Sequence, residues 1–282
     1  MSVAEVARTR LATALLGRVA GEDHAAKHAQ IHDTPGDRWF APDSAIAQVH
    51  GDASMFVGGL RALLLQSLHP LAMAGVAGHS GYRGDPWGRL QRTSTFLATT
   101  TFGTATDAER MIARVRAVHE RVRGRSPEGV AYSASDPHLL RWVHIAEVDS
   151  FLTAHQRYGN APLDAHGADA YVSDVAVVAR ALGVIDPPTD VAGLERALAS
   201  YRHELGGTTA ARDAARFLLV EPPLPFLARG PYAALAGAAV GLMPRWTRQP
   251  LGLPYAPTVE RTVGRASGQV MVGTIRWALA GF

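Results

Sequence analysis

The sequence predicts an all-α fold, a single-domain helical bundle, and three observations support this prediction. Apolar residues recur at the three- and four-residue spacing of helices through most of the 282 residues. Strand signals are almost absent, because the β-branched residues lie within helical periods instead of alternating with polar ones. The chain has no internal repeat and no low-complexity linker. We therefore expect one domain over residues 45–282, preceded by an N-terminal helix and arm over residues 1–44.

The helices are predicted in chain order from their apolar spacing and from capping residues. Ser135, Asp136 and Pro137 form a helix start, and glycines at 159 and 183 are typical helix ends. Gly58 and Gly59 lie inside a predicted helix, where glycine allows close packing. The expected helices cover residues 3–20, 45–69, 71 onwards, 89–102, 106–124, 138–158, 166–183, 189–205, 208–219, 230–243 and 257–280, with a polar arm over 22–44 and a loop over 78–88.

The composition excludes several classes of protein. Hydrophobic residues make up 47% of the chain, which is enough for a sizeable core. The absence of cysteine excludes disulfides, thiolate nucleophiles, iron–sulfur clusters and zinc ribbons, and leaves 12 histidines as the strong nitrogen ligands. The 28 basic residues alternate with 25 acidic ones, so nucleic-acid binding has little support. No phosphate-binding glycine loop follows a strand, and no GxSxG motif occurs.

The apolar segments also bear on the location of the protein. The N-terminal segment is an arginine-bearing amphipathic helix without the continuous apolar core of a signal peptide. No apolar run reaches the length of a transmembrane helix, and the nearest, Tyr232 to Met243, is typical of a buried helix. We therefore expect a cytoplasmic protein with no transmembrane segment.

The stretch from Arg89 to Gly124 contains the main candidate site. Two helices joined at Gly103 are expected to bring Arg89 and Thr93 towards the face that carries His119. Two interpretations of His119 stay open from the residues alone. It is either a helix histidine on a basic surface or an axial haem ligand, because a neutral imidazole facing an apolar pocket is a common proximal arrangement.

The polar residues around His119 have a structural and a functional interpretation. Arg89 and Thr93 share a helix face at four-residue spacing, so they either pair with neighbours or act on bound dioxygen and substrate. Arg92 is expected to be exposed or to face a haem propionate. The remaining arginines near His119 would bind propionates or be solvated: Arg116, Arg121 and Arg123.

Other histidines offer a second metal hypothesis. His69 precedes a proline at a helix end, His79 lies in the glycine-rich loop, and His144 lies on an apolar helix face. Each alone is more often a hydrogen-bonded histidine than a ligand. A non-haem iron site would be assembled from His69, His119, His144 and Glu147, although no HExxH or other close ligand spacing supports it.

A set of motifs takes the interpretation further. The runs LLLQSLHPLAMAGVAGHSGYRGDPWGRLQRT, FG, VHERVRG, YSASDPHLLRWVH, PPLPF and LGLP follow one another in this order. With them the chain resembles the superfamily of latex-clearing (rubber) oxygenases and MpaB-type oxygenases over roughly residues 40–260. This resemblance implies an all-α domain with a globin-like core around haem b. It implies that His119 is the proximal iron ligand and that Arg89 and Thr93 form the catalytic RxxxT motif, with Arg92 as the basic residue before the threonine.

The chain departs from the rubber oxygenases in one respect. Those enzymes use a glutamate upstream of the motif arginine, whereas residues 66–84 contain no carboxylate here. The candidate residues for that side of the pocket are Gln66, His69 and His79, with His144 as a further pocket candidate. The reaction implied is dioxygen activation at haem iron and oxidation of an apolar small molecule that is isoprenoid-, lipid- or polyketide-like. The alternatives are a haem-binding sensor or carrier without turnover, a non-haem iron enzyme, and a family member that serves only in interactions.

Overall fold

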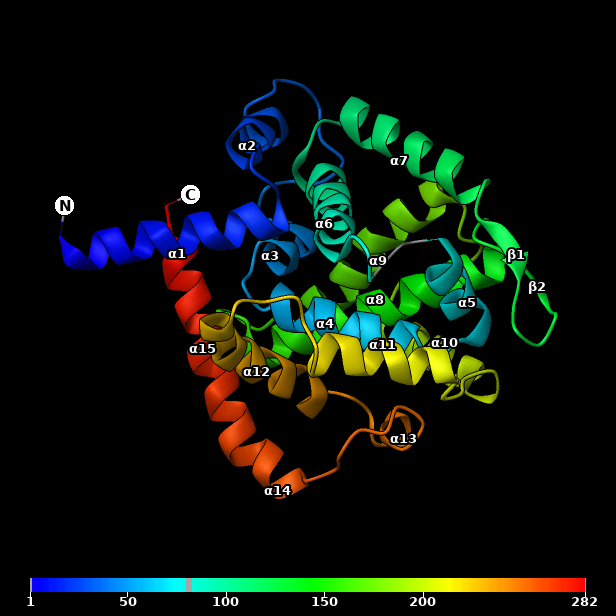
Figure 1. The fold of residues 1–282 in the computed structure, drawn as a ribbon. Helices are drawn as coiled ribbons and strands as arrows, with labels where there is room; N and C mark the ends of the chain where they lie inside the picture. The colour runs from blue at the N-terminus through cyan, green and yellow to red at the C-terminus, as the bar shows by residue number, and fades with distance from the viewer. Residues whose placement is uncertain (1, 80–82, 282) are drawn as a thin grey trace.

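The computed structural model describes residues 2–79 and 83–281 and confirms an all-α, single-domain fold (Figure 1). The first helices are α1 Val3–Val19, α2 His24–His32, α3 Ala45–His50, α4 Met55–Gln66, α5 Pro70–His79, α6 Pro86–Phe102 and α7 Ala105–His119. After a two-stranded antiparallel sheet of β1 Arg123–Arg125 and β2 Ala131–Ser133 come α8 Pro137–Tyr158, α9 Ala165–Leu182, α10 Val191–Ser200 and a 3-10 turn, η1 Tyr201–His203. The chain ends with α11 Thr209–Leu219, α12 Phe226–Gly241, α13 Arg245–Arg248, and α14 Pro257–Val259, which continues through a π-helical segment, η2 Glu260–Gly264, into α15 Arg265–Leu279.

The centre of the molecule is the contact between α4 and α8 (Figure 1). Trp142, Ile145 and Val148 of α8 are completely buried, as expected for a helix surrounded by others. Gly58 of α4 faces Phe151, and a Cβ atom at that position would lie 2.8 Å from Cδ1 of this ring. The glycine therefore sets how closely the two helices approach, as the sequence predicted.

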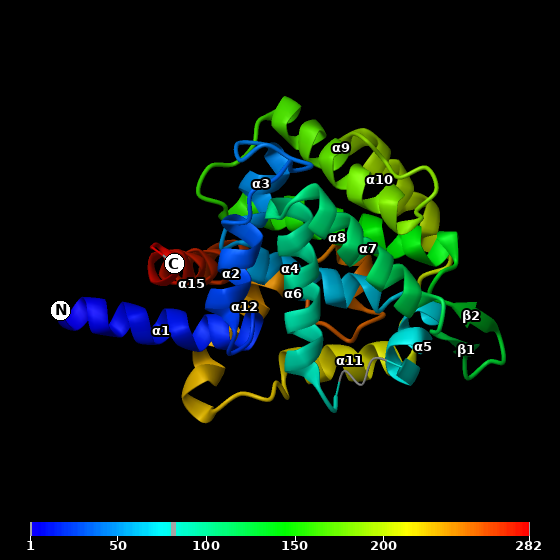
Figure 2. The ribbon, with the colours of Figure 1, turned by 90° about the horizontal axis from the view of Figure 1, so that it is seen from above.

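Two hydrophobic clusters surround this contact. The larger one joins α8 to α3, α9 and α10, and the smaller one joins α4 to α12 and α15 through residues such as Val57, Ala238 and Val272. Helix α1 packs against α15 and α6 (Figures 1 and 2). Nη1 of Arg8 donates a hydrogen bond to the carbonyl of Ala280, near the other end of the chain. The first helix is thereby attached to the bundle.

Helix α7 is shorter than the sequence predicted. We expected it to continue to Gly124, but it ends at His119 and the chain enters the β1–β2 hairpin. The amide of Ala134 donates to the carbonyl of Val122 over 2.8 Å, and Gly124 pairs with Tyr132, so these backbone groups are taken by the hairpin. At the other end, the N-cap of α7 is Thr104, whose hydroxyl oxygen accepts a hydrogen bond from the amide of Asp107.

Two other boundaries differ from the prediction. The predicted arm over 22–44 contains a helix, α2. The long helix expected from residue 45 is interrupted between Gly51 and Ser54, because the carboxylate of Asp52 accepts a hydrogen bond from the amide of Ser54 and turns the chain into α4. Within the described ranges, no single helix has the length and hydropathy to cross a membrane. Only α4 and α5 taken together pass that test, across a bend of 108°.

Candidate functional site

The start of α6 presents the RxxxT motif. The carboxylate of Asp85 accepts a hydrogen bond from the amide of Gly88 over 2.9 Å, and Pro86 occupies the first turn, so the helix begins with a proper cap. Arg89 and Thr93 follow one turn apart, the first half-buried and the second exposed. The hydroxyl of Thr93 donates to the carbonyl of Arg89 over 3.1 Å. The motif is therefore held in register by its own helix.

His119 is the last residue of α7 and is half-buried. Burial lowers the pKa of His119, and the nearby charge of Glu120 opposes this shift only in part, so the imidazole is neutral at pH 7. Its Nδ1 is buried and has no hydrogen-bond partner within the described ranges. Such a group costs about 1–3 kcal/mol if it stays unpaired. A neutral imidazole with an unused buried nitrogen fits the requirements of an axial metal ligand.

The three arginines proposed to bind a cofactor all contact nearby oxygen atoms. Arg92 is exposed and its Nη1 lies 3.3 Å from the carboxylate of Asp85. Arg116 donates over 3.3 Å to the carbonyl of Ala181 on α9, and Arg123 on β1 donates over 2.6 Å to the carbonyl of Glu120. Their guanidinium groups lie at the surface, so these contacts can be exchanged for a stronger anionic acceptor.

Helix α8 carries two titratable side chains three residues apart. His144 is buried, burial lowers its pKa to about 4, and its Nε2 has no hydrogen-bond partner within the described ranges. Burial raises the pKa of Glu147 to about 7, although its side chain keeps part of its surface accessible. Burial also raises the pKa of Tyr171 well above its usual value, and the charge of Glu147 adds to this shift. His144 and Tyr171 are therefore neutral at pH 7, whereas Glu147 titrates near this pH.

The remaining pocket candidates have different surroundings. Gln66 donates to the carbonyl of Val143 over 3.3 Å, and its own carbonyl accepts from the indole of Trp142, so it joins α4 to α8. His79 ends α5 and is exposed. Its ring and that of Tyr132 meet edge to face, with their centroids 6.1 Å apart. Part of the loop after it, residues 80–82, lies outside the described residues.

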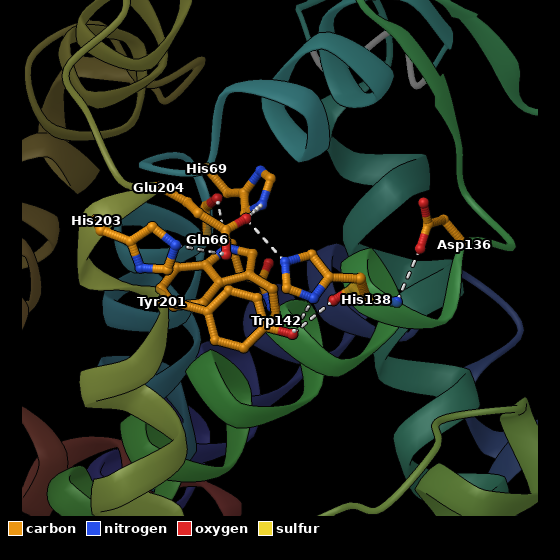
Figure 3. A network of polar contacts seen from close by, with 8 residues as sticks. All are labelled: Gln66, His69, Asp136, His138, Trp142, Tyr201, His203 and Glu204. Carbon is orange, nitrogen blue, oxygen red and sulfur yellow. Dashed lines mark hydrogen bonds and ion pairs between the residues drawn. The ribbon is translucent and has the colours of Figure 1, made fainter.

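The structure corrects the non-haem metal hypothesis. Among the described residues, His119, His144 and Glu147 do not come close enough to His69 to form a ligand cluster with it. The cluster that the described residues do form consists of His69, His138 and Glu204 (Figure 3). Nε2 of His138 lies 2.8 Å from Oε2 of Glu204, and Nε2 of His69 lies 3.4 Å from the same oxygen. Sequence reasoning missed His138 and Glu204, since they are far apart along the chain and have no characteristic spacing.

Comparison with known proteins identifies the family. Residues 47–277 match the sequence model of a family described as "ER-bound oxygenase mpaB/B'/Rubber oxygenase, catalytic domain". The chain belongs to the MpaB/rubber oxygenase family. The matched region runs from α3 to α15, so it includes Arg89, Thr93 and His119. The description of this family names oxygenases.

Two curated proteins are similar to part of this MpaB/rubber oxygenase family member. They are the uncharacterized protein Mb2261 of Mycobacterium bovis and the uncharacterized protein Rv2237 of Mycobacterium tuberculosis. Each is 34% identical over 111 residues, which is 38% of this chain and 43% of the relative. The match thus spans less than half the length of these relatives. No solved structure matches the chain significantly.

Proposed function

We propose that the protein is a haem b-dependent oxygenase that uses dioxygen to oxidise an apolar small molecule. The observation that carries this proposal is the buried, unpartnered Nδ1 of His119 at the end of α7, inside the region matched by an oxygenase family. Haem b requires a neutral axial imidazole, and burial supplies it, because it lowers the pKa of His119. When bound, the haem supplies the activation of dioxygen, while the protein supplies the ligand, the polarity of the pocket and its access.

We assign Arg89 and Thr93 to the substrate and dioxygen side. A guanidinium and a hydroxyl on one helix face are hydrogen-bond donors that can hold a polar diatomic or orient a substrate. Among the described residues, the hydroxyl of Thr93 bonds to its own helix backbone, and a rotation about χ1 releases it. We further propose that Arg92, Arg116 and Arg123 exchange their present contacts for the haem propionates, since guanidinium and carboxylate form charge-assisted pairs.

The substrate class follows from the chemistry that the chain lacks. Residues 66–84 contain no carboxylate, so this segment offers no glutamate base for cleaving polyisoprene. We therefore propose a smaller apolar substrate, isoprenoid-, lipid- or polyketide-like, oxidised without a base from this segment.

An absorption spectrum of the purified protein tests the haem assignment. After expression with haem supplied, we expect a Soret band that shifts on reduction with dithionite. His119→Ala should lose or shift this band, because the axial ligand is gone, whereas His166→Ala, a change at an exposed histidine of α9, should keep it. The absence of a Soret band, or an unchanged band in His119→Ala, would contradict the proposal.

A turnover assay separates the oxygenase from a carrier. The reduced, haem-loaded protein is incubated with ¹⁸O₂ and a panel of isoprenoids and unsaturated lipids, and products are analysed by mass spectrometry. We expect a product that contains ¹⁸O. A stable complex with dioxygen and no product from any of these compounds would indicate a haem-binding sensor or carrier instead.

A further inference from the structure

Three segments of the chain converge at His69, His138 and Glu204 (Figure 3). His69 lies at the bend between α4 and α5, His138 in the first turn of α8, and Glu204 directly after η1. One potential ligand atom from each residue lies within 4.8 Å of the other two. Two imidazoles and one carboxylate are the donor set that zinc and ferrous iron prefer, whereas magnesium and calcium prefer oxygen ligands.

His69 is the residue that indicates a ligand. Its side chain is only 3% exposed, and neither ring nitrogen has a hydrogen-bond partner within the described ranges. Burial lowers the pKa of His69, and the carboxylate of Glu204 opposes this shift. A buried imidazole that makes no hydrogen bond is costly in a folded protein, and a bond to a metal ion removes that cost.

The backbone holds the three side chains in place without an ion. The carboxylate of Asp136 accepts a hydrogen bond from the amide of His138 over 2.8 Å and begins α8, with Pro137 at its first position. The amide of Gly206 donates to the carbonyl of Leu68 over 2.8 Å, which ties the segment after Glu204 to the bend that carries His69. The site is therefore preorganised by contacts of the main chain.

The outer contacts also suit an ion bound to Nε2 of His138. The hydroxyl of Tyr201 donates to the carbonyl of His138 over 2.9 Å, and its oxygen lies 3.2 Å from Nδ1 of the same residue (Figure 3). That oxygen can accept a hydrogen bond from Nδ1–H, which leaves the lone pair on Nε2, the arrangement common for metal-bound histidines. His138 is 53% exposed, so an ion can enter from solvent and keep a water ligand.

One of the three separations already matches that expected around a tetrahedral ion. Two ligand atoms about 2.1 Å from a tetrahedral metal lie about 3.4 Å apart. Nε2 of His69 and Oε2 of Glu204 already have this separation, at 3.4 Å. The 2.8 Å contact between His138 and Glu204 is a hydrogen bond. It opens by about 0.6 Å when an ion takes the place between Nε2 and the carboxylate, and the imidazole proton then lies on Nδ1, where the Tyr201 oxygen accepts it.

We propose that His69, His138 and Glu204 form a binding site for one divalent transition-metal ion of the zinc and ferrous iron class, with a water molecule completing its coordination. The site is independent of the proposed haem function, because it uses none of the residues assigned to the haem. Only His69 was a candidate pocket residue in the sequence.

Zinc titration tests the site in the full-length protein. The purified protein is treated with a chelator, which leaves haem in place, and Zn²⁺ binding is measured by calorimetry and by counting zinc after desalting. We expect one ion per chain. Fe²⁺ added anaerobically should compete for the same site.

Three variants identify the ligands. Glu204→Gln and His138→Ala alter partly exposed side chains, and we expect each to weaken Zn²⁺ binding at least tenfold, since loss of even an outer-shell partner costs about 10- to 100-fold. His203→Ala is the matched control, because His203 is 78% exposed and its Nε2 lies 3.6 Å from the same carboxylate. It should bind normally. An equal loss in all three variants, or no stoichiometric binding in the parent protein, would overturn the proposal, whatever the Soret band shows.

Discussion

At the scale of residues, α8 carries two titratable side chains whose pKa values are shifted by burial. Burial lowers the pKa of His144 to about 4, so this imidazole is neutral at pH 7. Burial raises the pKa of Glu147 to about 7, so this carboxyl titrates around neutral pH. The charges of Arg141 and Arg180 add to the shift of His144.

Glu147 makes stability depend on pH. Its pKa is about 7 in the folded protein and 4.5 when unfolded, so the folded state holds the proton more tightly. The contribution of Glu147 to stability is then greatest below pH 4.5, falls as the pH rises towards 7 and levels off above it. The change is about 3 kcal/mol at most, from 2.5 pKa units at 1.36 kcal/mol each. We expect Glu147→Gln to remove this decrease.

Chemical denaturation at pH 5, 6, 7 and 8 measures the effect of Glu147→Gln. The variant should gain stability over the parent as the pH rises. Glu109→Gln, at an exposed site on α7, serves as the control and should follow the parent at every pH. A constant difference between Glu147→Gln and the parent across this range would show that the carboxyl does not titrate there.

At the scale of elements, the two glycines of α4 have opposite environments. A Cβ atom on Gly58 would lie 2.8 Å from Cδ1 and 3.2 Å from Cα of Phe151, whereas one on Gly59 meets nothing within 4 Å. We expect Gly58→Ala to destabilise the protein by about 1–3 kcal/mol through overpacking. Gly59→Ala should be neutral or stabilise by up to about 1 kcal/mol, because alanine favours the helix.

Urea denaturation of the two glycine variants gives a direct comparison. Both variants add one methyl group, at adjacent positions of the same helix. The gain in helix propensity is therefore the same in both and cancels in the comparison. Equal midpoints for Gly58→Ala and Gly59→Ala would mean that α4 and α8 can separate without cost.

The elements show what apolar periodicity can predict. It predicted the helices around α8, α9 and α10 well, because their buried faces repeat over several turns. It missed the interruption at Asp52, which one side-chain hydrogen bond to the backbone produces. It also extended α7 through Val122, since the hairpin that ends this helix depends on a partner strand ten residues later.

At the scale of the whole molecule, Arg61 joins three helices. This buried arginine of α4 has its Nη1 2.7 Å from the carboxylate of Asp149 and 2.7 Å from the hydroxyl of Ser150, both on α8. Its Nε donates over 3.0 Å to the carbonyl of Leu242, just after α12. The guanidinium therefore connects the two hydrophobic clusters.

Replacing Arg61 should affect the entire fold. Arg61→Met keeps most of the volume but leaves Asp149 without its cation, and we expect a loss of about 3 kcal/mol. Arg110→Met is the control, because the 2.6 Å pair of Arg110 with Asp107 lies at the surface, where such pairs contribute less than about 1 kcal/mol. Urea denaturation compares the two. A similar small loss of stability in both variants would mean that the attraction within the buried pair only balances the cost of removing its two charges from water.

The candidate sites also differ in how far the sequence predicted them. Arg89, Thr93 and His119 are predicted from the sequence because the first two share a helix turn and all three lie in motifs that resemble those of the family. The cluster of His69, His138 and Glu204 required the tertiary fold, since its members come from three separate segments. Local spacing carries no information about such a set.

The contact between α4 and α8 also has a consequence for folding during synthesis on the ribosome. Helix α4 is complete at Gln66, but its partner ends only at Tyr158. At a synthesis rate of about 5–20 residues per second, α4 waits roughly 5–18 s for that partner. During this interval the apolar side chains of α4 and α5 are exposed as a nascent segment, which makes the early chain a natural client for chaperones.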